Sequence, residues 1–163
     1  MEKWKCSVCG YIHEGPMPED FKCPICKQPA SVFKKIVEAK AKFYICRHCG
    51  NLIGMIHDSG VPVVCCGQKM EALIPNTVEA SGEKHLPVVT VEAGTVTVNI
   101  GSVDHPMIPE HYIEWVYVQT ENGGQRKALK PGDAPNVSFC LGDDKAIAVY
   151  AYCNLHGLWM TEV

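Results

Sequence analysis

The chain has 163 residues, ten cysteines, seven histidines and a formal net charge of -3. This length suits one ordinary domain, or a domain of about 100 residues with small additions. The weak net charge gives no indication of a surface for nucleic acid or membrane. No stretch approaches a transmembrane span, and the polar N-terminus lacks the apolar run of a signal peptide, so we expect a cytoplasmic protein.

Cysteine is the most informative residue type in the chain. Ten cysteines without a secretion signal are typical of metal ligands or redox thiols rather than of structural disulfides. The histidines concentrate in the second half, which predicts a thiolate-rich front joined to an imidazole-rich back. The eight cysteines before residue 67 are Cys6, Cys9, Cys23, Cys26, Cys46, Cys49, Cys65 and Cys66.

The first segment, residues 1 to about 37, carries CSVCG and CPIC on either side of a polar, proline-rich stretch. Two C-x-x-C turns separated by 13 residues strongly indicate a metal site, because each turn presents two thiolates to one tetrahedral ion. The following KKIVEAKAK, residues 34–42, is a charged connector in which we expect one or two helical turns, and residues 38–42 are assigned as the linker.

The second segment, residues 43–75, contains CRHCG and, after 15 intervening residues, the adjacent pair Cys65 and Cys66. Neighbouring cysteines do not readily form a disulfide with each other, because a trans peptide resists the required dihedral angle and Cβ separation. CRHCG supplies one pair of thiolates and the adjacent cysteines supply the other, so a second metal site is expected. Each of the two segments has only about 35 residues, too few for a stable core, so a metal is expected to supply the folding free energy.

From residue 76 onward the apolar pattern has a period of two, which predicts β-strands. Three hairpins are expected, with turns at 92–94, 122–124 and 142–144, together with a further strand near 71–79. About seven strands in roughly 90 residues indicate an immunoglobulin-like β-sandwich over 76–163. The whole chain is therefore predicted to be mainly β.

The number of strand crossings places the later histidines at one end of this sandwich. His85 precedes the first hairpin, and His105 and His111 follow its second strand. Every later pair of crossings returns the chain to the same end, where Cys153 and His156 lie, so one site built from loops is expected. Four imidazoles and one thiolate exceed the four ligands that zinc prefers, which favours iron with a sixth position open to a small ligand.

Several motifs resemble known families. CRHCG and VVCCGQKM resemble desulforedoxin, the N-terminal domain of desulfoferrodoxin. GEKHLPVV, DHPMIPEHYIEW and YAYCNLHGLW resemble the neelaredoxin-type catalytic domain of superoxide reductases. Residues 1 to about 37 resemble the rubredoxin domain of rubrerythrins through CSVCGYIHEG and CPIC. A rubredoxin domain in front of desulfoferrodoxin departs from the common two-domain arrangement.

The resemblance implies three mononuclear iron sites and the one-electron reduction of superoxide, with two protons, to hydrogen peroxide. It implies that the two four-thiolate centres carry single electrons. The first is bound by Cys6, Cys9, Cys23 and Cys26, and the second by Cys46, Cys49, Cys65 and Cys66. The implied ligands of the catalytic iron are equatorial His85, His105, His111 and His156, with axial Cys153.

The resemblance also implies roles for residues and partners around the catalytic iron. Lys84 is expected to attract the superoxide anion and to orient a proton-donating water. Glu83 resembles the family carboxylate that occupies the sixth position of the oxidised iron. We expect a rubredoxin or an NAD(P)H-dependent reductase as the electron donor, a homodimer by resemblance to desulfoferrodoxins, and no nucleic-acid or membrane partner.

Other interpretations of the same residues remain open. Spacing alone favours structural zinc in the four-cysteine clusters, as in zinc ribbons, and the chain would then be a scaffold with an immunoglobulin-like interaction domain. A pure electron carrier and a superoxide dismutase are further alternatives. His13, His48 and His57 are interpreted as surface residues because the sites beside them already have four sulfurs, and Cys140 in VSFCL as a small core residue.

Overall fold

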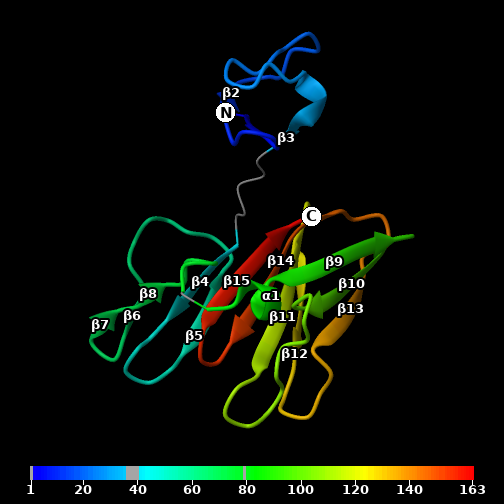
Figure 1. The fold of residues 1–163 in the computed structure, drawn as a ribbon. Helices are drawn as coiled ribbons and strands as arrows, with labels where there is room; N and C mark the ends of the chain where they lie inside the picture. The colour runs from blue at the N-terminus through cyan, green and yellow to red at the C-terminus, as the bar shows by residue number, and fades with distance from the viewer. Residues whose placement is uncertain (1, 36–40, 79) are drawn as a thin grey trace. The chain divides into compact units, whose positions relative to one another are not determined.

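The structure is a computed structural model that describes residues 2–35, 41–78 and 80–163. The chain divides into two compact units, Met1–Glu38 and Ala39–Val163 (Figure 1). The middle of the charged connector, in which helical turns were expected, lies outside the described residues. Within the described residues, no helix is long and apolar enough to cross a membrane.

The first unit is a three-stranded antiparallel sheet around a very small core. β1 (Lys3–Cys6) lies between β2 (Ile12–Glu14) and β3 (Phe33–Lys35), and a single turn of 3-10 helix, η1 (Ala30–Val32), leads into β3. Two of the three core residues buried in the described part of this unit are cysteines; the three are Cys6, Cys23 and Phe33. A core of this size does not stabilise a fold without a further crosslink, and the four cysteines of this unit are the candidates for one.

The second unit begins with a module of short strands. β4 (Lys42–Ile45) pairs with β5 (Leu52–Met55) and with β8 (Glu71–Ala72). β6 (Val64–Cys65) and β7 (Gln68–Lys69) form a separate hairpin. The β4–β5 connection and the β6–β7 turn carry the cysteines of this module, so its short strands serve to present thiols.

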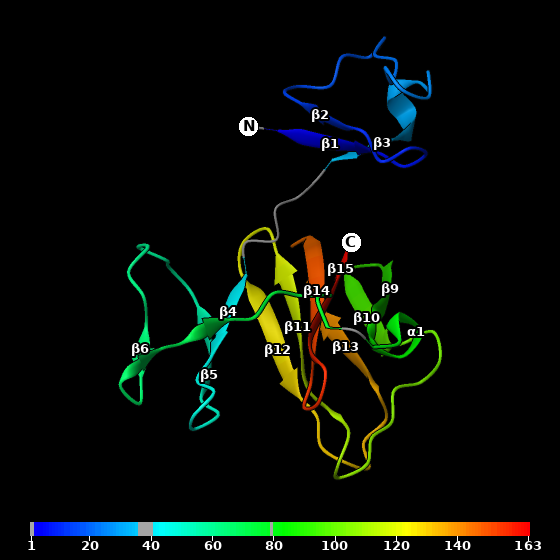
Figure 2. The ribbon, with the colours of Figure 1, turned by 60° about the vertical axis from the view of Figure 1, so that its left-hand side comes forward.

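Seven strands form a β-sandwich in the rest of the second unit (Figure 2). One sheet has the order β13–β10–β9 and the other the order β12–β11–β14–β15. This arrangement, preceded by two four-cysteine modules, confirms the predicted mainly-β fold. The strands are β9 (Pro87–Glu92), β10 (Thr95–Ile100), β11 (Ile113–Thr120), β12 (Gly124–Ala128), β13 (Asn136–Cys140), β14 (Ala146–Cys153) and β15 (Gly157–Glu162).

β14 is buried on both of its faces. Val149, Ala151 and Cys153 belong to the core between the two sheets. The alternate residues, including Tyr150 and Tyr152, form a second buried cluster with side chains of β4 from the preceding module. Because side chains alternate along a strand, this pattern turns Cys153 toward the interior of the sandwich.

The strand register gathers several loops at one end of the sandwich. The last residue of β10 pairs with the first of β9, while Cys153 pairs with both Ile113 and Gly157. A short helix, α1 (Gly82–His85), immediately precedes β9 at this end. The loop between β10 and β11 and the turn after β14 therefore lie beside α1.

Two details of the predicted strand pattern are wrong. β13 and β14 do not form a hairpin, because β13 pairs with β10 in one sheet and β14 pairs with β11 and β15 in the other. In the described part of 71–79 the only strand is β8, which belongs to the preceding module, and the seventh strand of the sandwich is β15. The predicted position of the histidines does not depend on these two details. The β13–β14 connection joins two sheets, but it reverses the direction of the chain just as a hairpin does.

Candidate metal centres

Three C-x-x-C turns in the chain share one set of backbone hydrogen bonds. The first cysteine accepts a bond at its carbonyl from the residue four positions later, and its N–H donates to the carbonyl five positions later. For Cys46 these partners are Gly50 and Asn51, each at 2.8 Å. The residue four positions later has a positive φ in every case, 79° at Gly10, 61° at Lys27 and 81° at Gly50. Each turn thus presents its two thiols as a pair.

The first unit brings two such turns face to face. The four sulfur atoms all lie within 4.8 Å of one another. The Sγ atoms of Cys6 and Cys26 are 3.6 Å apart, and those of Cys9 and Cys23 are 3.5 Å apart. Four thiols at this spacing suit a tetrahedral, sulfur-preferring ion such as iron or zinc.

The adjacent cysteines of the second cluster belong to a tight hairpin. Cys65 ends β6, and Cys66 and Gly67 form the turn before β7, with φ angles of 51° and 74°. Two consecutive positive φ angles are typical of a type I′ turn. The Sγ atoms of the pair are 3.9 Å apart, so no disulfide joins them, and both lie within 4.8 Å of the sulfurs of Cys46 and Cys49.

The thiols of the second cluster differ in acidity. The backbone N–H of Cys49 donates toward the sulfur of Cys46 and helps to lower the pKa of Cys46 to about 6. The neighbouring Cys49 thiol, together with burial, raises the pKa of Cys66 to about 12. Four thiolates this close repel one another, and a bound cation removes that penalty.

The third cluster lies where the loops converge at the end of the sandwich. His85 is the last residue of α1, His105 and His111 lie between β10 and β11, and Cys153 is the last residue of β14. One ligand atom from each of these four residues lies within 4.8 Å of the others. His85, His105 and Cys153 are buried.

Backbone carbonyls fix the orientation of two imidazoles in this cluster. His85 donates from Nδ1 to the carbonyl oxygen of Ser81 at 2.7 Å, and His105 donates from Nδ1 to that of Pro106 at 2.6 Å. A carbonyl oxygen only accepts, so the proton of each ring lies on Nδ1. The Nε2 atom of each ring therefore carries the lone pair that a metal requires.

His156 lies beside this group of four residues. Its Nδ1 is 3.0 Å from Nε2 of His85 and 3.7 Å from Sγ of Cys153. Its ring centroid is 4.9 Å from that of His111. The backbone N–H of His156 also donates to the sulfur of Cys153 at 3.4 Å. The structure therefore brings together all five residues that the sequence singles out as donors.

The donor atoms of the third cluster fit a metal ion. The Nε2 atoms of His105 and His111 are buried and have no hydrogen-bond partner among the described residues, an arrangement that is costly unless something else binds them. Burial lowers the pKa of His105 to about 4, so this ring is neutral at neutral pH. Burial also raises the pKa of the Cys153 thiol, a cost that a bound cation offsets. Neutral imidazoles and one thiol suit iron.

The two expected catalytic side chains both lie in α1 and are exposed. Burial is the main cause of the lowered pKa of His111, and the positive charges of His156 and Lys84 contribute to it. Lys84 is thus within electrostatic range of the histidines. The carbonyl of Glu83 accepts a hydrogen bond from the N–H of Val103 at 3.1 Å, which ties α1 to the loop that follows β10.

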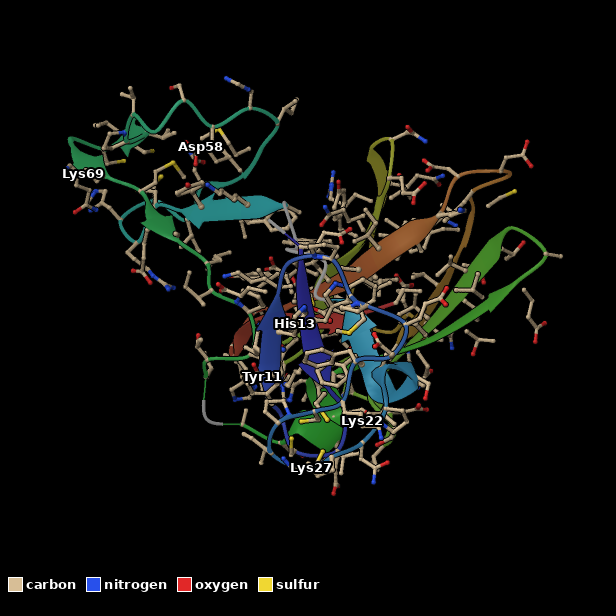
Figure 3. All side chains as sticks on the ribbon, turned by 90° about the horizontal axis from the view of Figure 1, so that it is seen from above. Tyr11, His13, Lys22, Lys27, Asp58 and Lys69 are labelled. Atoms are coloured by element: carbon tan, nitrogen blue, oxygen red, sulfur yellow. The ribbon has the colours of Figure 1, made fainter. Side chains whose placement is uncertain are left out.

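The remaining histidines lie outside the metal-binding groups of the described residues. His13, on β2 of the first unit, is labelled in Figure 3. Its ring centroid is 4.4 Å from that of Phe21, and its Nε2 donates to the carbonyl of Pro16 at 3.3 Å. His48 and His57 are exposed. His48 and His57 are thus surface residues as interpreted, whereas His13 is half-buried.

The interpretation of Cys140 as a core residue is wrong. Cys140 is exposed at the end of β13, and the preceding Phe139 is the buried residue. The prediction assigned the buried positions of VSFCL one residue too late. A shift of one residue exchanges the buried and exposed faces of a strand.

Comparison with known proteins identifies the family. A family profile described as Desulfoferrodoxin matches residues 77–162, more than half of the chain. This chain belongs to the desulfoferrodoxin family. A second profile, described as the rubredoxin-like domain of rubrerythrin, matches residues 4–34 of this desulfoferrodoxin. The two profiles confirm the resemblance of the sandwich to the catalytic domain of superoxide reductases and that of the first segment to the rubredoxin domain of rubrerythrins.

Individual desulfoferrodoxins match most of the chain. The desulfoferrodoxin of Nitratidesulfovibrio vulgaris is 43% identical over 121 residues, which are 74% of this chain and 95% of that protein. The desulfoferrodoxin homolog of Archaeoglobus fulgidus is 43% identical over 118 residues, 72% of this chain and 94% of that protein. The crystal structure of the superoxide reductase from Treponema pallidum has a TM-score of 0.65 and 42% identity, and the match covers 76% of this chain and 99% of that chain.

The sequence did not predict the groups that orient the ligands of this desulfoferrodoxin. The carbonyls of Ser81 and Pro106 act through the backbone, which leaves no trace in residue type. Gly101, which lets the chain pass close to α1 after β10, has a φ of 88°. A glycine directly after an alternating strand was the available indication of such a close approach.

Proposed function

We infer that this desulfoferrodoxin is a superoxide reductase, which reduces superoxide with one electron and two protons to hydrogen peroxide. The observation that carries this inference is the convergence of three imidazoles and the Cys153 thiol, with the fourth imidazole beside them. Five donors exceed the four that zinc prefers, and an iron that they held would be able to take a small anion as well.

We propose that each chain holds three irons. Family membership and the close approach of the sulfurs in both four-cysteine clusters support iron there. The proposed ligands of the first two irons are Cys6, Cys9, Cys23 and Cys26, and Cys46, Cys49, Cys65 and Cys66. Those of the catalytic iron are His85, His105, His111, Cys153 and His156.

The residues of the chain have distinct roles around the catalytic iron. Ferrous iron in this site supplies the electron that superoxide takes up. Lys84 attracts the anion and holds a water that donates a proton. The Cys153 thiolate accepts the N–H of His156 and would donate electron density to an iron held in this site. Glu83 is assigned as a carboxylate that would bind the oxidised iron.

The first unit is assigned as a tethered electron donor. After each turnover the catalytic site needs one electron, and a carrier on the same chain is present at high effective concentration. The upstream donor in this proposal is a rubredoxin or an NAD(P)H-dependent reductase. The corresponding domains are the rubredoxin-like residues 1–37, the desulforedoxin-like residues 43–75 and the catalytic residues 76–163, and the enzyme is assigned as a homodimer by similarity to desulfoferrodoxins.

The yield of peroxide per superoxide tests the proposed reaction. Pre-reduced protein should give one hydrogen peroxide for each superoxide consumed, whereas a dismutase gives one for every two. A pure electron carrier would leave the spontaneous yield unchanged. Metal analysis of the same sample should find three irons per chain and a visible absorption that disappears on reduction. Two zincs and no redox-dependent absorption would contradict the three-iron assignment.

A further inference from the structure

Asn154 joins the two loops that carry His111 and Cys153. Its side-chain Oδ1 accepts a hydrogen bond from the backbone N–H of Tyr112 at 2.9 Å, and its Nδ2 donates to the carbonyl of Glu110 at 3.1 Å. Its own backbone N–H donates to the carbonyl of Tyr112 at 3.1 Å. One residue thus makes three hydrogen bonds to the neighbours of His111.

These bonds hold the His111 backbone on both sides. Glu110 precedes His111 and Tyr112 follows it, so the peptide units around His111 cannot shift without breaking a bond to Asn154. Across the loop, Ile108 and His111 exchange two backbone hydrogen bonds of 3.1 and 3.0 Å, which close it into a tight turn. The turn therefore behaves as one piece whose attachment to β14 includes Asn154.

The position of Asn154 in the sheet explains why a side chain is needed there. The β11–β14 ladder ends at the pair Ile113 and Cys153. Beyond this pair, the Asn154 amide extends the ladder by one step, because an amide offers both an acceptor and a donor to the opposite backbone. A hydrophobic residue in its place would leave the N–H of Tyr112 and the carbonyl of Glu110 without these partners.

We propose that Asn154 is a positioning residue that sets the distance between the His111 ring and the Cys153 sulfur, and thereby tunes the metal that both bind. The proposal rests on the proposed function only in taking these two residues as ligands of one iron. Groups that orient ligands without binding the metal commonly change metal affinity or activity by about 10- to 100-fold when removed.

The chain offers a matched control for this role. Asn76 makes the same two-sided contact with Met160, accepting the N–H at 2.8 Å and donating to the carbonyl at 3.0 Å. It lies outside the ligand loops and has a φ of 61°. Asn76→Ala therefore removes two comparable hydrogen bonds and adds backbone strain, without touching a ligand-bearing turn.

The test compares Asn154→Ala and Asn154→Asp with Asn76→Ala in the full-length iron-loaded protein. Thermal unfolding, the midpoint potential of the catalytic iron and the rate of iron loss to a chelator are measured for each. Asn154→Ala should shift the potential and its visible band and release iron about tenfold faster or more. Asn154→Asp keeps the acceptor for Tyr112 and should give smaller changes. Asn76→Ala should lower stability at least as much while leaving potential and band unchanged.

The outcomes distinguish a residue that positions the metal ligands from one that only stabilises the fold. If Asn154→Ala loses stability but keeps the wild-type potential, band and rate of iron loss, Asn154 only stabilises the fold and the proposal is overturned. If Asn154→Ala does not fold, the same comparison is made with Asn154→Asp. An unchanged midpoint potential and an unchanged rate of iron loss in that variant overturn the proposal. These readouts do not depend on turnover. A wild-type protein that fails to yield peroxide would contradict the proposed function and leave the ligand-positioning result intact.

Discussion

At the scale of single residues, Gly101 determines how closely α1 approaches the end of β10. A Cβ atom at this position would lie 2.7 Å from the carbonyl oxygen of Glu83, 2.9 Å from the carbonyl carbon of Lys84, and against the carbonyl of Val103. All three are backbone atoms, which do not move aside as a flexible side chain does. The placement of Lys84 and His85 therefore depends on a residue without a side chain.

Gly101→Ala should destabilise the protein and disturb the catalytic site. A left-handed alanine alone costs about 1–2 kcal/mol, and the backbone overlap should raise the total to about 3 kcal/mol or more. Gly132→Ala is the control, because Gly132 has a similar φ of 91° and a Cβ atom there would have no other atom within 4 Å. Urea unfolding and the catalytic visible band are measured for both. Equal destabilisation by the two substitutions would show that crowding at α1 has no effect.

Lys84→Ala should slow the reaction of reduced enzyme with superoxide. Loss of the positive charge beside the histidines should reduce the bimolecular rate constant about tenfold, equivalent to about 1.4 kcal/mol, and should weaken its dependence on ionic strength. Lys145→Ala removes an exposed lysine next to the turn before β14, at the other end of the sandwich, and should leave both quantities unchanged. Pulse radiolysis over a range of salt concentrations measures them. An unchanged rate and salt dependence for Lys84→Ala would assign Lys84 to the solvated surface.

At the scale of secondary-structure elements, two kinds of feature were predictable from the sequence. They are the local cysteine turns and the number of times the chain reverses direction. The C-x-x-C turns are local, since each closes with backbone bonds within six residues, and their cysteines were recognised from spacing alone. The convergence of the histidine loops followed from the number of chain reversals. Pairing between strands was less predictable, because the β13–β14 connection resembles a hairpin in sequence but joins two different sheets. The final strand β15 begins directly after the turn at 154–156 that carries His156, and it was not counted among the strands expected from the sequence.

Metal removal should unfold the first unit before the sandwich. The buried core described for that unit consists of Cys6, Cys23 and Phe33, so its stability depends on the metal that links the cysteines. The sandwich retains a core that spans both sheets. Hydrogen exchange after chelation of the reduced protein should show rapid exchange in β1–β3 and continued protection in β11 and β14. Persistent protection of β1–β3 without metal would mean that the small apolar cluster suffices.

At the scale of the whole molecule, the division into two compact units has a kinetic consequence. Deletion of residues 1–37 should leave the single-turnover oxidation of pre-reduced enzyme by superoxide nearly unchanged, because the catalytic residues all belong to the second unit. Steady-state turnover supplied by an NAD(P)H-dependent reductase should fall, because electrons then reach the catalytic site only by diffusional encounter.

The control for this deletion is the full chain with Cys9→Ser. This substitution removes one thiolate from the first cluster but keeps the chain length. Stopped-flow oxidation and steady-state rates are compared over a range of donor concentrations. If the truncated protein matches the full chain in steady state at every concentration, the first unit is not the point at which electrons enter.

β14 lies between the second four-cysteine module and the histidine cluster and packs against residues next to both. Tyr152 packs into the cluster that includes Ile45, which directly precedes Cys46, and Tyr152 is itself bonded to Cys153. Cys46 and Cys153 are thus each bonded to a residue of one packed cluster, which connects the end of β4 with β14. Free-energy coupling between two sites is reciprocal, so the effect of metal at the histidine cluster on the four-cysteine cluster equals the effect in the opposite direction. We therefore expect metal binding at the two sites of the second unit to be linked through this shared cluster.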